Sequence, residues 1–150
     1  MRIFYSICFS VLVAFGVDSG HGGEHAHHNE HEHGFGFVAL PECDFATEDC
    51  VVKFEDKEIK FSLSPRPIVA MMPLTLRISG LDEQDGLKVK ISGVNMDMGA
   101  NEYELVRRGG DYMANITVSS CVMQQMIYRA QIFSNDKPLG LYSDFVLRNN

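Results

Sequence analysis

The sequence contains no tryptophan and no histidine after position 33. These absences exclude the common Ser-His and Cys-His catalytic pairs from most of the chain, together with a blue-copper His₂Cys electron-transfer site. The chain also lacks a glycine-rich phosphate loop and a recognisable pair of carboxylates of the glycosidase type. We therefore predict that the protein is not an enzyme.

Clusters of basic residues are also missing. The chain has 13 Lys and Arg against 20 Asp and Glu, which gives a net charge of −7. Nucleic acids and anionic membranes attract basic surfaces, so neither is an expected partner.

Only one long apolar run is present. Residues 2–17 read RIFYSICFSVLVAFGV, a run shorter than the ~20 residues that cross a bilayer. Turn-forming residues follow it, as in a secretory signal peptide. We predict a signal peptide over residues 1–20, cleavage near His21, and a periplasmic or secreted protein with no further membrane span. An uncleaved anchor helix is the alternative.

A histidine-rich tract follows the apolar run. Residues 21–36 read HGGEHAHHNEHEHGFG and show no apolar periodicity, so we expect them to be disordered. Imidazoles with nearby carboxylates bind Cu(II), Zn(II) or Ni(II), and the irregular spacing matches no fixed zinc motif. The tract is a predicted secondary metal site, with a plain polar linker as the alternative. It contains all six histidines of the chain: His21, His25, His27, His28, His31 and His33.

After cleavage three cysteines remain, an odd number for an oxidising compartment. Cys43 and Cys50 bracket a short polar loop, and we predict a disulfide between them. Cys121 is then unpaired, so it would be buried, bound to a metal, or paired between subunits.

Residues 37–150 have the pattern of an all-β domain. Apolar and polar residues alternate in short runs separated by turn residues, and no long helical stripe appears. This pattern predicts an antiparallel β-sandwich of about seven or eight strands, of immunoglobulin-like or cupredoxin-like type. Arg107–Gly110 and Ser134–Pro138 are the predicted hairpin turns. The predicted strands are 51–54, 58–63, 74–78, 87–91, 103–106, 112–118, 127–133 and 141–147.

Two predicted loops are rich in sulfur. The first covers residues 93–99 and the second residues 119–126. Loops at strand ends build binding sites in sandwiches, and thioether and thiolate donors favour Cu(I). The alternative is that these methionines fill gaps in the core, the role we expect for Met71, Met72 and Met113. The predicted metal ligands are Met96, Met98, Cys121, Met123 and Met126.

The run V-N-M-D-M-G at 94–99, with Cys121 followed by Met126 and Tyr128, resembles small bacterial periplasmic sandwich proteins. The resemblance is to the YtkA-like and FixH-like families and covers residues 73–133. It implies a role in copper supply or cytochrome oxidase assembly. Its implied ligands are Met96, Met98, Cys121 and Met126, with Met123 as an additional sulfur. Tyr128 stands where the resemblance leads us to expect tryptophan.

Two hypotheses follow. In the first, the protein is a periplasmic Cu(I) carrier or chaperone that serves a copper-receiving protein such as an oxidase assembly factor. In the second, it is an exported sandwich that binds other proteins, while its histidine tract buffers zinc, nickel or copper.

Overall fold

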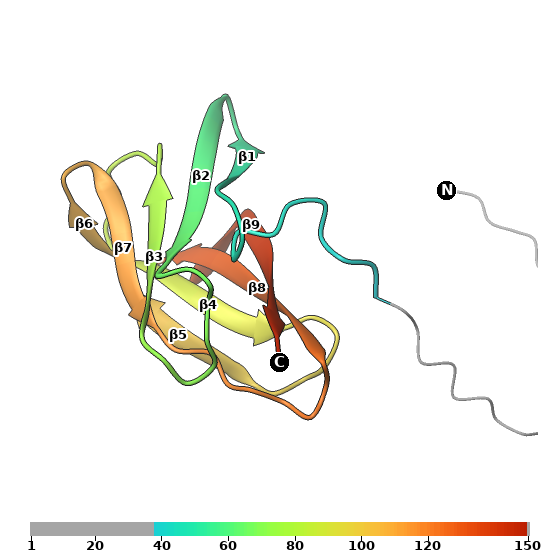
Figure 1. Cartoon of the computed structure of the whole chain (residues 1–150). Helices are drawn as coiled ribbons and strands as arrows, with labels where there is room; N and C mark the ends of the chain where they lie inside the picture. The colour runs from blue at the N-terminus through green and yellow to red at the C-terminus, as the bar shows by residue number, and fades with distance from the viewer. Residues whose placement is uncertain (1–37, 150) are drawn as a thin grey trace, which may run out of the picture. The chain divides into compact units, whose positions relative to one another are not determined.

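The computed structural model describes residues 38–149 and is all-β in this range. The predicted signal peptide (1–20) and histidine tract (21–36) lie outside the described residues. No helix in the described range is long and apolar enough to cross a membrane. Within residues 38–149, nine antiparallel strands form two sheets (Figure 1), which confirms the predicted β-sandwich. The strands are β1 (Cys50–Phe54), β2 (Lys57–Ser64), β3 (Leu74–Ser79), β4 (Leu87–Gly93), β5 (Ala100–Glu104), β6 (Val106–Arg108), β7 (Asp111–Ile116), β8 (Gln125–Ser134) and β9 (Lys137–Arg148).

One sheet has the order β1-β2-β3-β7-β6 and the other the order β5-β4-β8-β9. The chain changes sheets at Leu105, whose side chain is buried between β5 and β6. The segment predicted as a single strand over 103–106 therefore belongs to two strands. The sequence pattern does not reveal the break, because the buried Leu105 continues the alternation of apolar and polar residues through the crossing. This split gives nine strands where seven or eight were expected.

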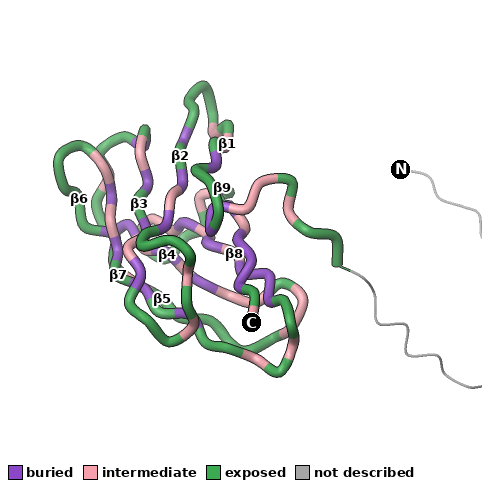
Figure 2. Tube along the Cα trace, viewed as in Figure 1, coloured by how far each residue is buried: buried purple, intermediate pink, exposed green. Residues whose placement is uncertain are grey.

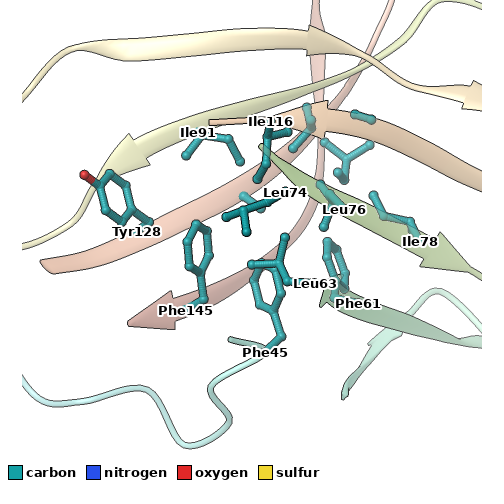
Figure 3. Close-up of a cluster of buried hydrophobic side chains, with 14 of the residues drawn as sticks. Phe45, Phe61, Leu63, Leu74, Leu76, Ile78, Ile91, Ile116, Tyr128 and Phe145 are labelled. Carbon is teal, nitrogen blue, oxygen red and sulfur yellow. The ribbon is translucent and has the colours of Figure 1, made fainter. Parts of the chain in front are cut away.

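The core lies between the sheets and is built from the inward residues of alternating strands. Phe61 on β2 and Leu76 on β3 are fully buried, as is Ile132 on β8. Figure 3 shows part of this cluster. Aromatic rings occupy the space that a tryptophan would fill: Phe145 lies 4.8 Å from Phe45 and 5.4 Å from Tyr128, measured between ring centroids.

Two hairpins are tighter than predicted. Asn135 and Asp136 alone connect β8 to β9, and both have a positive φ, as a two-residue hairpin turn requires. Gly109 and Gly110 alone connect β6 to β7, since Arg107 and Arg108 belong to β6. Both glycines have a positive φ, and a Cβ atom added to either would meet nothing within 4 Å.

The predicted disulfide between Cys43 and Cys50 is confirmed, with their Cα atoms 5.9 Å apart. Asp44 ties the enclosed loop to β9, because its carboxylate accepts a hydrogen bond from the Val146 backbone N–H at 2.9 Å and from the Arg148 guanidinium at 3.0 Å. The segment before β1 is thereby fixed against the last strand.

Candidate metal centre

Three loops meet at one end of the sandwich, which we call the sulfur end: residues 65–73, 94–99 and 117–124. The strand register places them together, because the ends of β3 and β7 are paired, as are those of β4 and β8. In Figure 1 the β4–β5 and β7–β8 connections lie at the lower edge of the view. The same segments are largely exposed in Figure 2.

Gly93, the last residue of β4, lets the first of the sulfur-bearing loops fold back over the sandwich. A Cβ atom at this position would lie 2.0 Å from the Met96 carbonyl oxygen and 3.4 Å from the Met126 Cε atom. Only glycine leaves room for this approach. Gly93 therefore brings the Met96 backbone and the Met126 side chain to the same place.

Asn95 locks the same loop onto the start of β8. Its side-chain amide donates to the Gln125 carbonyl at 3.0 Å, and its side-chain oxygen accepts the Ile127 N–H at 2.9 Å. The Val94 N–H adds a backbone bond to the Ile127 carbonyl at 2.8 Å. The position of Met96 is thus set by its two preceding residues.

The second sulfur-bearing loop is held by Asn149, which follows β9. The Asn149 side-chain amide donates to the Cys121 carbonyl at 2.7 Å and to the Met123 carbonyl at 2.8 Å, and its backbone N–H donates to the Gln124 carbonyl at 3.0 Å. Sequence reasoning missed Asn149, because an isolated asparagine far along the chain carries no signal that it closes over another loop.

Cys121 and Met96 bring the two loops into direct contact. The Cys121 Sγ atom lies 3.0 Å from the Met96 Sδ atom, although 25 positions separate the residues. Both side chains are half-buried and pack against the core. Cys121 is the free cysteine of the described range. The thiol and the thioether therefore form a preassembled pair of soft donors.

Tyr128 supports the cysteine loop from within the sandwich. Its hydroxyl donates to the Ser119 carbonyl at 2.6 Å, and its ring stacks on Phe145. In Figure 3 the hydroxyl points outward from the core cluster. Burial raises the pKa of Tyr128, and the negative charge of a Cys121 thiolate raises this pKa further. Tyr128 consequently remains a neutral donor beside the thiol.

The other three predicted ligands occupy different environments. Met126 is completely buried on β8, and so does not belong to the preceding loop as predicted. Met123 is half-buried, and Met98 is 40 % exposed. The chain bends over residues 94–96, and the side chains of Met96 and Met98 differ in burial.

The packing role expected of Met71 and Met72 is wrong. These side chains are 67 % and 55 % exposed in the β2–β3 loop. Met113 on β7 is half-buried, as a packing residue would be. The proline-rich approach to β3 gave no periodicity from which the exposure of the two methionines could be predicted.

The donors at the sulfur end are neutral or singly charged sulfur atoms, which suit a soft monovalent ion. Within residues 38–149, no three histidine, cysteine, aspartate or glutamate side chains are grouped so that they could hold a metal ion. The side-chain donors in contact at the sulfur end are the sulfur atoms of Cys121 and Met96.

Comparisons with known proteins return no match: no family model, curated protein or solved structure is significantly similar to the chain. The resemblance to the YtkA-like and FixH-like families therefore stays a prediction based on short motifs.

Proposed function

We propose that the protein is an exported carrier of Cu(I), which it holds at the sulfur end through Cys121 and Met96. The observation that carries this proposal is the 3.0 Å approach of the Cys121 and Met96 sulfur atoms across two loops. A half-buried thiol and thioether could pack in many ways without touching. Here four loop-fixing hydrogen bonds, from Asn95 and Asn149, hold the two residues in place.

The geometry needs a small adjustment to accept the ion. Two sulfur ligands at about 2.3 Å from a metal, in tetrahedral or trigonal arrangement, are about 3.8 to 4.0 Å apart. The pair must then open by roughly 0.9 Å relative to the metal-free contact. Half-buried side chains on loops can make this change by small rotamer shifts.

Met126 is the best-placed third ligand, because its methyl group lies beside Gly93, against which the Met96 carbonyl also packs. Met123 or Met98 would complete a four-coordinate site. A mixed thiolate and thioether set keeps affinity for Cu(I) in an oxidising compartment, where sites made of several thiols are lost to disulfides. The Cys43–Cys50 disulfide supports export to such a compartment.

The first test is an anaerobic Cu(I) competition titration on the mature chain, with the six histidines replaced by asparagine to silence the tract. We expect tight binding of one ion per chain. Cys121→Ser and Met96→Leu should each weaken it strongly, whereas the matched control Met113→Leu should leave it unchanged. Unchanged affinity in the Cys121 and Met96 variants would overturn the assignment.

The alternative function is an interaction module in which the sulfur atoms are only buried. It is favoured by the exposed Val122, 96 % accessible beside Cys121. Thiol labelling separates the two functions: Cu(I) should protect Cys121 of a carrier, whereas a thiol that is merely packed should label slowly with or without copper.

A further inference from the structure

The β2–β3 loop presents two methionines to solvent. Met71 and Met72 are 67 % and 55 % exposed, while Met126 is completely buried and Met96 is half-buried. Methionine usually stabilises a protein by filling space in the core, and two exposed methionine side chains do not contribute in this way. Their role must therefore be sought outside the core.

Met71 is also held in an unusual backbone conformation. Its φ is 62°, in the left-handed region that non-glycine residues rarely occupy. The Met71 backbone N–H donates to the Val118 carbonyl at 2.9 Å. Val118 lies three residues before Cys121 in the chain. This hydrogen bond attaches the methionine turn to the cysteine loop.

A cavity separates the same two loops. It has a volume of about 560 Å³ and is open to solvent. The β2–β3 loop forms one wall through Pro67, Ile68, Val69 and Ala70, and Met71 follows directly. Ser120, Cys121, Arg148 and Asn149 line the cavity from the other side, and the charge of Arg148 is paired with Asp44. Of the five predicted ligands, Cys121 is the one that lines it.

We propose that Met71 and Met72, which follow the β2–β3 wall of this cavity in the chain, form an outer thioether site that binds Cu(I) weakly and passes it to Cys121 and Met96. The transfer step rests on the proposed function. Two neutral thioethers bind a soft monovalent ion more weakly than a set that includes a thiolate, so the ion moves inward. No change of oxidation state is involved, since both sites take Cu(I).

The outer site can be tested without the inner one. The sample is the mature chain carrying Cys121→Ser, Met96→Leu and the histidine-to-asparagine changes, with ¹³C-labelled methionine methyl groups. It is titrated with Ag(I), which replaces Cu(I) without redox chemistry. We expect the Met71 and Met72 methyl signals to shift at lower Ag(I) than that of Met113, which serves as the internal control. Equal shifts at all three, or none at Met71 and Met72, would overturn the proposal.

The transfer step needs a second measurement, on the chain with an intact inner site. Met71→Leu/Met72→Leu removes both sulfur atoms but keeps the apolar surface, and Met113→Leu is the matched control. We expect the double variant to take up Cu(I) from a weak chelator severalfold more slowly, with unchanged equilibrium affinity. An unchanged uptake rate would mean that these side chains offer only apolar contact, and it would rule out the transfer. If only the proposed function were wrong, the chain would not bind Cu(I) tightly at Cys121 and Met96, but the Met71 and Met72 signals would still shift with Ag(I).

Discussion

The two ends of the sandwich expose different kinds of side chain. The sulfur end has three long loops and six exposed large apolar side chains: Val69, Met71, Met72, Val94, Met98 and Val122. The opposite end, which we call the ion-paired end, consists of the turns 55–56, 80–86, 109–110 and 135–136. No described residue of these turns is an exposed large apolar side chain. Figure 1 shows the β1–β2 and β6–β7 turns at the top and upper left, away from the loops of the sulfur end.

Ion pairs join the turns of the ion-paired end to neighbouring strands. Lys57 pairs with Asp82, Arg107 with Glu83, and Lys88 with Asp136. A surface of this kind is well solvated and offers no apolar patch to a partner. The two ends of the sandwich therefore expose different side chains, and the proposed function assigns binding to the sulfur end alone.

The largest effect on the sulfur end is expected from a substitution of Gly93. Gly93→Ala places a Cβ atom against the Met96 carbonyl, so the loop must move, and we expect a destabilisation of about 2 to 3 kcal/mol. Cu(I) affinity should fall as well, because Met96 is displaced from Cys121. Urea unfolding and the copper titration measure the two effects.

The matched control is Gly99→Ala, at the other end of the same loop. An added Cβ atom there meets nothing within 4 Å, so only the cost of its positive φ remains, about 1 kcal/mol. Equal effects of the two changes would show that the close contact at Gly93 is unimportant.

The disulfide tests whether the sulfur end depends on the start of the domain. Cys43→Ala/Cys50→Ala opens a short loop, which should cost about 2 kcal/mol of stability through the greater freedom of the unfolded chain. Cu(I) affinity should be unchanged, since Asn95 and Asn149 hold the sulfur loops independently. Chemical denaturation with and without reductant measures the loss of stability. If reductant destabilised the double variant as much as the wild type, the loss could not be assigned to the Cys43–Cys50 disulfide.

Tyr128→Phe should have a smaller effect, because it removes one hydrogen bond to Ser119 and keeps the ring stacking. We expect a loss of about 1 kcal/mol at neutral pH. The raised pKa also gives a pH dependence: the unfolded chain releases this proton first, so wild-type stability falls as pH rises through the ordinary tyrosine range and up to the raised value. The phenylalanine variant lacks this contribution. The free energy of unfolding of the two proteins should be measured at increasing alkaline pH, and the difference between them should become smaller. A difference that stays constant would show that Tyr128 does not contribute to the pH dependence of stability.

The smallest effect is expected at the ion-paired end. Lys57→Ala and Arg107→Ala remove exposed ion pairs, each worth less than about 1 kcal/mol. Copper binding should not change. Thermal unfolding at low and high salt is the measurement, and a weakened copper site would show that the two ends are coupled.

Much of the fold could be predicted from the sequence, because strand alternation reports directly which face is buried. Leu87, Val89 and Ile91 alternate with lysines and serine, and they form β4 as expected. The boundaries failed where alternation continued through a crossing, as at Leu105, or where a turn was shorter than its polar residues suggested, as at Lys137.

The candidate site was less predictable. Residue type and strand-end position brought Met96 and Cys121 into consideration, and they are in contact. Burial could not be derived in this way, so Met126 was placed in a loop and Met71 and Met72 in the core. Loop conformation depends on long-range contacts such as those of Asn149, and these leave no local pattern in the sequence.

The turn at Gly109 and Gly110 has a practical value for anyone who wishes to follow the protein in use. The space around both glycines is open, and the turn belongs to the end of the sandwich that we assign no binding role. A short flexible insertion there should anchor a fluorophore or attach the protein to a surface while both proposed metal sites stay accessible. A tag inserted into the loops 94–99 or 117–124 would instead disturb the contacts that such an experiment aims to observe.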